Sequence, residues 1–351
     1  MGASYNASTY IHWTNYYERG PKHLLNKLLA MEASRMAKLD LKDSIVAEER
    51  KVIMEERYMR LNNKPSAMLS NKILTALFEA HPMGRPVIGW EQDMRSLNTE
   101  DYLEWHRQYY APNNAILIIT GDFDIHKTKA EIEKQFGSIP ARKTVKRVKW
   151  TEPLERGVHK TLTLKDQRVQ QPRFQWAVHA DSYSYGDPKL ALAAGILSDA
   201  LFMPEIGLVH KELVGRQKIV TSISGVNDAS VPMGYFWITA IPAPGISTHE
   251  IANKLNALLK QISEDGISAE MIEKIKNRII NAQEYEKDSI FGIAHSVGET
   301  LIADLPLDFA MNSVNYLKTV TAADVNKVLR ETLLKRSAVE GHLLPDQTAK
   351  S

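Results

Sequence analysis

Two carboxylates at helical spacing, Glu49 and Glu56, are the residues of this chain whose type and position could support acid–base chemistry or metal binding. They lie in residues 44–60, where apolar residues recur every three or four positions and predict a helix. Glu49 precedes Val52 and Ile53 by three and four residues, and Glu56 follows them by four and three, so both acids are predicted to lie on the apolar stripe. A buried acid costs roughly 2–7 kcal/mol unless it is paired, protonated or bound to a metal. Two interpretations stay open here, namely structural acids paired with nearby arginines and a functional site.

The second half of the chain repeats the pattern of the first, which predicts two related α+β domains. A capped helix over 99–110 followed by the apolar run 115–120, which predicts a buried strand, matches a helix from Thr321 to about Leu334 followed by a strand over 338–344. We expect an N-terminal domain over 1–140, a linker over 141–157 and a C-terminal domain over 158–351.

The duplication provides an internal control for the two acids. An alignment by eye, uncertain by one residue, places Glu56 opposite Gln283 and Glu49 opposite Asn277. The matching helix therefore keeps its apolar character but carries neither acid. This contrast favours a functional role for Glu49 and Glu56 over a structural one.

Composition excludes several classes of function. The 351 residues carry a net charge of +2, so nothing indicates a nucleic-acid or membrane surface. No apolar run reaches the length of a membrane span. The chain has no cysteine, which rules out disulfides, thiolate zinc sites, iron–sulfur clusters and cysteine nucleophiles.

Histidine spacing argues against a zinc site built by this chain alone. Catalytic zinc takes three protein ligands and a water. None of the 11 histidines lies three or four residues from another, so neither His-x-x-x-His nor His-x-x-Glu-His occurs. Scattered histidines would have to assemble, and His12 and His81 are the candidates that we keep.

Several segments taken together resemble the M16 family of zinc metallopeptidases, the pitrilysin, insulinase and mitochondrial processing peptidase group. The resemblance extends over essentially the whole chain, including its duplication. The segments that carry it are Asn6–Thr9 with Thr14–Tyr17, Glu49–Glu56, His81–Gly89, Tyr109–Asn114 and Gly121–Asp124.

The resemblance implies a fold and a set of roles. The fold would be two related α/β-sandwich domains, each a mixed, largely antiparallel sheet packed by helices, which form a clamshell around a peptide. Glu56 would be the third zinc ligand, and Glu49 the second acid, which supports the catalytic site. Asn6 and Ala7 would lie in an edge strand that binds the substrate backbone. Bacterial relatives suggest the periplasm or cell envelope, although the chain shows no signal peptide.

The chain also departs from the family pattern. The His-x-x-Glu-His helix, which supplies two zinc ligands and the general base, would precede Met1, so we expect an N-terminally incomplete first domain with an exposed sheet edge and an apolar patch. In the second half, Val214 and Thr221 stand where active members often carry a substrate-binding Arg and Tyr, and Arg216 is a candidate substitute.

The sequence therefore predicts a metalloendopeptidase homologue that binds peptides but does not hold zinc or hydrolyse peptides alone. The alternatives are a non-catalytic partner or scaffold subunit and a plain peptide-binding module. In each case we expect a homo- or hetero-oligomer with an M16-like subunit.

Overall fold

The computed structural model describes residues 2–143, 150, 152, 158–229, 232–286 and 289–346. They form two compact units that each combine helices with a sheet, so the predicted α+β fold class is confirmed. The first unit comprises the described residues of 1–57, 86–149 and 289–298, and the second those of 58–85, 150–288 and 299–351.

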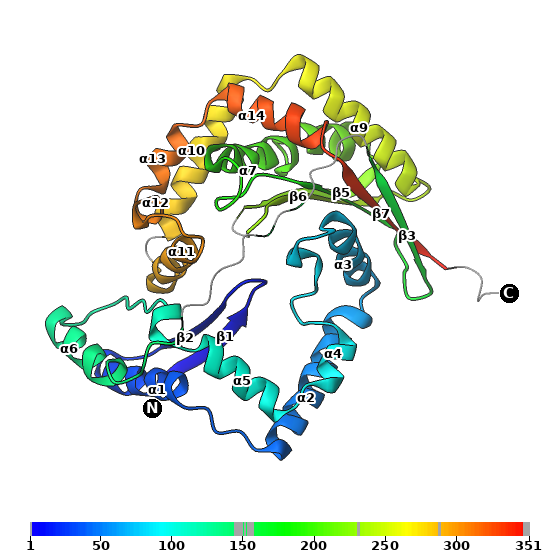
Figure 1. Ribbon diagram of the computed structural model, residues 1–351. Coiled ribbons are helices and arrows are strands. Elements are labelled where there is room, and N and C mark those ends of the chain that lie inside the picture. The colour runs from blue at the N-terminus through cyan, green and yellow to red at the C-terminus, as the bar shows by residue number, and fades with distance from the viewer. Residues whose placement is uncertain are drawn as a thin grey trace. The chain divides into compact units, whose positions relative to one another are not determined.

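The second unit is built on a five-stranded mixed sheet (Figure 1). Its outer strand β3 runs parallel to β7, whereas the β7–β4, β4–β6 and β6–β5 pairs are antiparallel. In spatial order the strands are β3 (Lys160–Asp166), β7 (Ala338–Pro345), β4 (Arg173–His179), β6 (Tyr235–Pro242) and β5 (Val220–Asp228).

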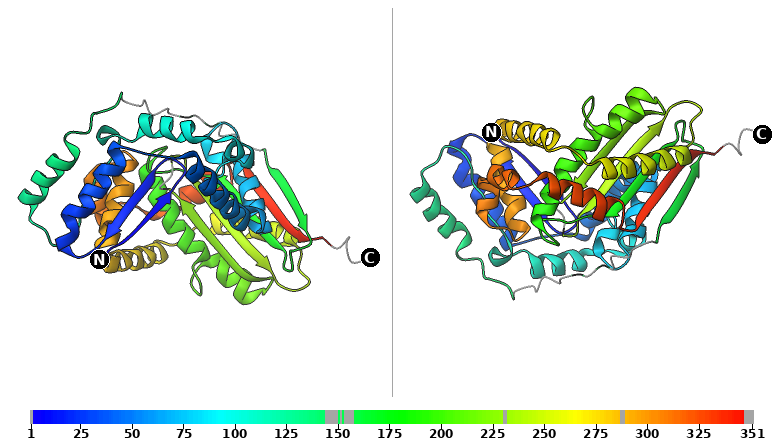
Figure 2. Two further views of the ribbon diagram at one scale, coloured as in Figure 1. Left: turned by 90° about the horizontal axis from the view of Figure 1, so that it is seen from below. Right: turned by 90° about the horizontal axis from the view of Figure 1, so that it is seen from above.

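Helices cover both faces of this sheet. Side chains alternate along β4, so Phe174, Trp176 and Val178 enter the main hydrophobic core while Gln175 and His179 face the opposite side. The core face carries α7 (Pro188–Phe202), α9 (Thr248–Asp265), α10 (Ala269–Glu286) and α14 (Ala322–Val328), and the opposite face carries α3 (Pro65–Leu77) (Figure 1). The right-hand view of Figure 2 looks onto the layer that contains α9, α10 and α14.

Helix α3 is fixed to the second sheet by polar contacts as well as by packing. The Gln175 Nε2 donates to the Ser70 Oγ at 2.7 Å, and the His179 Nε2 lies 2.9 Å from the Leu77 carbonyl oxygen. Residues 58–85 thus join the second unit although they precede the predicted linker. As a division of the sequence into related domains, the boundaries at 140 and 157 stay a prediction.

The first unit contains a small sheet surrounded by helices. Strands β1 (Ser4–Thr9) and β2 (Thr14–Arg19) pair in antiparallel register, with Asn6 opposite Tyr17. A turn with stacked Tyr10 and Trp13 rings joins them. The helices are α1 (Leu25–Ala37), α2 (Asp43–Arg57), α4 (Glu91–Ser96), α5 (Thr99–Tyr109), α6 (Ile125–Phe136) and residues 290–298 of α11 (Ile290–Ile302).

The predicted buried strand over 115–120 is not present, which corrects the sequence analysis. The structure assigns these residues no strand, and Ile116 and Leu117 are 45% and 46% exposed. Among the described residues they make no backbone–backbone hydrogen bond, so no neighbouring strand holds them. An apolar run reports a tendency to be buried in a sheet, but the pairing itself needs a partner.

The remaining elements are short. They are 3-10 turns at Lys22–Leu24, Pro82–Gly84 and Pro112–Asn114, π turns at Tyr58–Asn62, Lys211–Arg216 and Leu329–Leu333, and helices α8 (Leu208–His210), α12 (Leu307–Met311) and α13 (Ser313–Lys318). No helix in the described part of the chain has the length and apolar character needed to cross a membrane.

Candidate functional site

Helix α2 carries the two acids and packs against the segment 86–97 of the first unit. Val46 is buried, the Arg50 Nη1 donates to the Leu97 carbonyl at 2.6 Å, and the Arg57 Nη1 donates to the Gly89 carbonyl at 3.1 Å. These residues recur at the spacing of one helix face. The inward face of α2 is therefore the one that contains Val46, Arg50 and Arg57.

The predicted inward stripe of α2 is wrong in orientation. Ile45 and Val52 are 46% and 59% exposed, Glu49 is exposed, and Glu56 is partly buried. The exposed stripe lies one residue before the inward positions 46, 50, 53 and 57, which places it about 100° away around the helix. It consists of residues 45, 49, 52 and 56. Periodicity locates an apolar stripe, but only packing reveals which of two adjacent stripes meets a partner.

The structural interpretation of the acids also loses part of its support. Arg50 and Arg57, two of the arginines considered as partners, donate to backbone carbonyls. Glu49 makes no ion pair with any residue that the structure describes. Both acids therefore lie on a stripe of α2 that faces away from the segment 86–97 and that also carries the apolar side chains of Ile45 and Val52.

The described residues do not fit a complete zinc site. Glu49 and Glu56 lie two turns apart, or about 10 Å along the axis, whereas zinc–ligand distances are about 2 Å, so one ion cannot bind both. Nowhere among the described residues do three or more His, Cys, Asp or Glu side chains come together as a metal site. Glu56 can contribute at most one ligand of a centre whose other ligands lie elsewhere.

His81, kept as a candidate ligand, has a structural role in the second unit. Its Nδ1 accepts the Met83 N–H at 3.1 Å, and burial lowers its pKa below the ordinary value. The buried Glu152 carboxylate accepts three backbone N–H groups, those of Glu79 at 2.6 Å, Ala80 at 2.9 Å and His81 at 2.7 Å. The burial of Glu152 could not be predicted, because an acid in a connector gives no sequence signal of burial.

The predicted substrate strand β1 is exposed along nearly its whole length. Asn6 and Ala7 both lie in it, opposite Tyr17 and Tyr16 of β2. The Ala7 N–H donates to the Asn6 Oδ1 at 2.8 Å, so a neighbouring side chain satisfies this amide. Strand β1 is an outer strand of the two-stranded sheet, and its other edge has no strand partner among the described residues.

Arg216, the candidate substitute for a substrate-binding arginine, is already engaged. Its Nε donates to the Glu212 Oε2 at 2.6 Å, and this contact raises the pKa of Arg216 while it lowers the pKa of Glu212 to about 2. A substrate carboxylate would have to compete with Glu212 for Arg216.

A second group of ionisable residues in the first unit was not anticipated. Glu18 of β2 and Glu32 of α1 both lie within 4 Å of Arg35, at 3.6 and 2.7 Å. Burial, followed by the hydrogen bond and charge of Glu32, raises the pKa of Glu18 to about 8. Arg35 also lies over the Tyr16 ring, 4.5 Å from its centroid.

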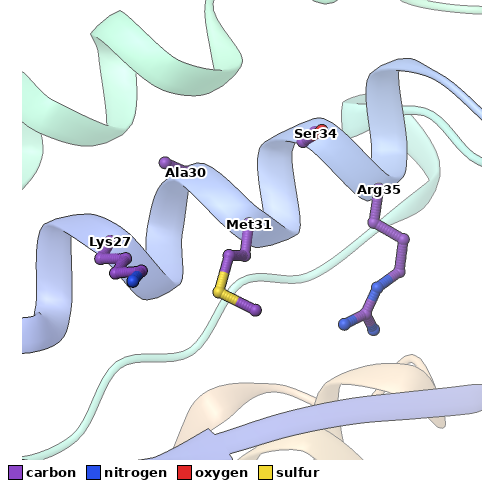
Figure 3. Close-up of a pocket in the computed structure, with 5 residues that line it drawn as sticks. All are labelled: Lys27, Ala30, Met31, Ser34 and Arg35. Carbon is purple, nitrogen blue, oxygen red and sulfur yellow. The ribbon is translucent and has the colours of Figure 1, made fainter. Parts of the chain in front are cut away.

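An open depression of about 500 Å³ lies along one face of α1 (Figure 3). A single helix lines it, with no carboxylate or histidine among the lining residues, so it supplies no set of catalytic groups. The lining residues are Lys27, Ala30, Met31, Ser34 and Arg35.

Comparison with known proteins gives these features a family context. Residues 1–91 match the model of insulinase-type peptidases of family M16, and residues 96–279 match the model of the M16 inactive domain. A zinc protease of Helicobacter pylori, PqqE, is 25% identical over 278 residues, which are 79% of this chain and 62% of that protein. An uncharacterised zinc protease of Mycobacterium leprae is 25% identical over 76% of this chain and 59% of its own length. The chain thus spans about three fifths of the length of these curated relatives.

Solved structures agree with this assignment at the level of the fold. A protease from Helicobacter pylori superposes with a TM-score of 0.89 at 23% identity, over 98% of this chain and 82% of that one. The first half of the periplasmic protease PqqL from Escherichia coli superposes with a TM-score of 0.77 at 15% identity, over 99% of this chain and 76% of that one. With the family models matched from residue 1 to 91 and from 96 to 279, the chain belongs to peptidase family M16.

Proposed function

We propose that this chain is an M16-type zinc metalloendopeptidase homologue that binds extended peptides and does not hydrolyse them by itself. The observation that carries this proposal is an exposed edge strand in a unit whose described residues form no cluster of three metal-binding side chains. Peptide recognition needs only the strand, whereas hydrolysis needs three zinc ligands and a base. On this view Glu56 is one ligand of an incomplete centre and Glu49 its supporting acid.

The peptide site is the open edge of β1. An extended substrate adds to such an edge through main-chain hydrogen bonds. The Asn6 Oδ1 accepts the Ala7 N–H in the free chain, so a substrate carbonyl would replace this side chain rather than fill an unsatisfied position. Exposure of Ala7 leaves room for that exchange.

Binding is tested with an unstructured fluorescent peptide and variants of β1. Ala7→Pro deletes the donor, and we expect it to weaken binding roughly three- to tenfold, the value of one backbone hydrogen bond. Asn6→Ala removes the competing acceptor and is expected to leave binding equal or stronger. Ala3→Pro, just outside the strand, is the matched control. Equal affinity of the Ala7→Pro and Ala3→Pro proteins would refute the assignment.

The metal is tested separately by elemental analysis of the purified chain. We expect far less than one zinc per chain, with no difference between the wild type, Glu56→Gln and the neighbouring control Glu55→Gln. We also expect no peptide hydrolysis by the isolated chain. Stoichiometric zinc that disappears in Glu56→Gln alone would show that the chain assembles its own centre.

The second candidate is a non-catalytic partner or scaffold subunit that pairs with an M16-like subunit. The exposed apolar residues of the first unit, Ile45, Val52, Ile116 and Leu117, favour it because such surfaces mark protein contacts. Peptide binding distinguishes the two, since a scaffold subunit would form a stable oligomer but would not bind an extended peptide at β1. For the compartment we propose the bacterial periplasm, and the structural similarity to the periplasmic protease PqqL of Escherichia coli supports this assignment.

A further inference from the structure

A buried carboxylate attaches the predicted linker over 141–157 to the second unit. This carboxylate belongs to Glu152, which is 6% exposed. Its Oε1 accepts the Glu79 N–H, and its Oε2 accepts the N–H groups of Ala80 and His81. These three amides lie just after helix α3, so the attachment joins the linker to the corner where the chain leaves that helix.

Two buried imidazoles flank this corner, and their hydrogen bonds fix which nitrogen carries the proton. The His81 Nδ1 accepts the Met83 N–H at 3.1 Å, so the proton of the neutral ring is on Nε2. The His179 Nε2 lies 2.9 Å from the Leu77 carbonyl oxygen, which can only accept, so this nitrogen carries a proton. The His179 Nδ1 is a bare acceptor, buried and without a hydrogen-bond partner in the described part of the chain. Each neutral ring would therefore take a further proton at Nδ1.

The aromatic ring of Phe78 lies beside both imidazoles. Its centroid is 4.8 Å from that of His179 and 6.0 Å from that of His81. Burial lowers the pKa of both histidines, and this effect outweighs the attraction of the Glu152 carboxylate for a proton on either ring. Tyr235 of β6, whose ring centroid is 6.1 Å from that of Phe78, stays neutral because burial raises its pKa.

The cations near His179 also oppose its protonation. Lys160 of β3 pairs with Glu79, and Arg336 pairs with Asp181 at 3.2 Å. The Arg336 Nη1 in addition donates to the His179 carbonyl at 3.0 Å. Both cations lower the pKa of His179 further, although their carboxylate partners lie beside them.

We propose that this corner is an acid-sensitive anchor, which holds the linker at Glu152 at neutral pH and releases it as the pH falls from 7 to 5. When the corner opens, both imidazoles reach water and take up protons near their ordinary pKa of 6.5. The open state therefore binds more protons than the closed state below this value, so acid favours opening and rising pH favours closing. A proton on the His81 Nδ1 also removes the acceptor of the Met83 N–H, which acts in the same direction.

The size of the response follows from the titration of the open corner. Between pH 7 and 5 an exposed histidine goes from about one quarter to nearly full protonation, which can raise the opening constant by up to roughly 25-fold per ring. The inference depends neither on peptide binding at β1 nor on zinc, because every residue that carries it belongs to the second unit.

Hydrogen exchange of the full chain at pH 7 and 5 tests the anchor. After correction for the intrinsic exchange rate at each pH, the protection of the amides of 79–83 should fall by about tenfold or more in the wild type. His81→Asn keeps an acceptor and His179→Gln keeps a donor for the backbone group that each contacts, but neither new side chain titrates. The double variant should lose less than about threefold over the same range. His159→Gln, at an exposed histidine of the same unit, is the control and should respond like the wild type.

A spin label tests the release of the linker directly, because the chain has no cysteine of its own. Trp150→Cys places the label two residues from Glu152, at a position that is 48% exposed. The paramagnetic resonance spectrum of this label should gain a fast component between pH 7 and 5, and the two histidine substitutions should abolish that gain. A label at Lys260→Cys, exposed on α9, is the control and should not respond to pH.

Other outcomes overturn the proposal. These are protection of 79–83 that does not change with pH, an equal loss in the wild type and the double variant, and a label at position 150 whose mobility rises equally with and without the two histidines. Circular dichroism at pH 7 checks that the variants fold. If the double variant does not fold, the single variants decide, and each should remove about half of the response on a logarithmic scale.

Discussion

The Glu152 carboxylate provides the sharpest test of how the second unit is held together. Its side chain is buried and accepts the N–H groups of residues 79, 80 and 81 at 2.6–2.9 Å. Glu152→Ala leaves these three donors without that acceptor. Glu152→Gln keeps one carbonyl oxygen but turns an NH₂ group toward N–H donors, so it should also destabilise the loop.

The magnitude follows from the number of bonds. A buried donor left unsatisfied costs about 1–3 kcal/mol, and entering water recovers part of this. With three donors affected, we expect Glu152→Ala to lower the free energy of local unfolding by about 3 kcal/mol. For Glu152→Gln we expect about half of that loss. A change of 1.4 kcal/mol corresponds to about a factor of ten in an equilibrium constant. The amides of this loop in the Ala variant should therefore lose roughly a hundredfold in protection against hydrogen exchange.

Native-state hydrogen exchange followed by mass spectrometry measures this protection in peptides that cover 79–85. Glu264→Ala, at an exposed acid of the same unit, is the control and should leave the exchange of these peptides unchanged. If Glu152→Ala and the wild type exchanged at the same rate in this segment, the three bonds would contribute nothing and the reasoning would be refuted.

Two further predictions concern a titrating acid and a tight contact. The pKa of Glu18 is raised to about 8, so the folded state keeps a proton that the unfolded state releases near pH 4.5. The free energy of unfolding should therefore fall as pH rises from 5 to 8, by about 3.5 kcal/mol without solvent screening and by roughly 2 kcal/mol with it, and Glu18→Gln should flatten this slope in denaturant titrations. Gly225→Ala would place a Cβ 2.2 Å from the buried Phe202 ring and should cost about 2 kcal/mol in the same assay, whereas Gly215→Ala, with open space around the new atom, should be neutral or slightly stabilising; equal midpoints would contradict this.

Much of the secondary structure follows from local rules. The helices α2 and α5, the helix α14 with the π turn that follows it, and the strand β7 lie within a few residues of the positions that spacing and caps predict. The expected cap of the helix over 99–110 is Asn98, which forms a capping box with Asp101, and this contact is local because the two residues are only three positions apart. Interactions of this range are encoded in the local sequence.

The orientation of the candidate site could not be predicted from the local sequence. Spacing placed Glu49, Val52 and Glu56 on one stripe, and the helix confirms that they share a face. Which stripe of α2 packs inward depends on the segment 86–97, whose carbonyls accept from Arg50 and Arg57. A hydrophobic pattern shows neither contacts with a segment that is distant in the sequence nor the carbonyl groups that accept hydrogen bonds there, so it could not predict which stripe packs inward.

The sequence by itself determined the family and the absence of cysteine and of a His-x-x-Glu-His motif in these 351 residues, because each is a property of residue identity and spacing. Only the tertiary structure decided that residues 115–120 pair with no strand among the described residues, that Val52 faces outward and that the connector acid Glu152 is buried. Strand pairing and burial are properties of two surfaces that meet, and a single segment carries only one of them.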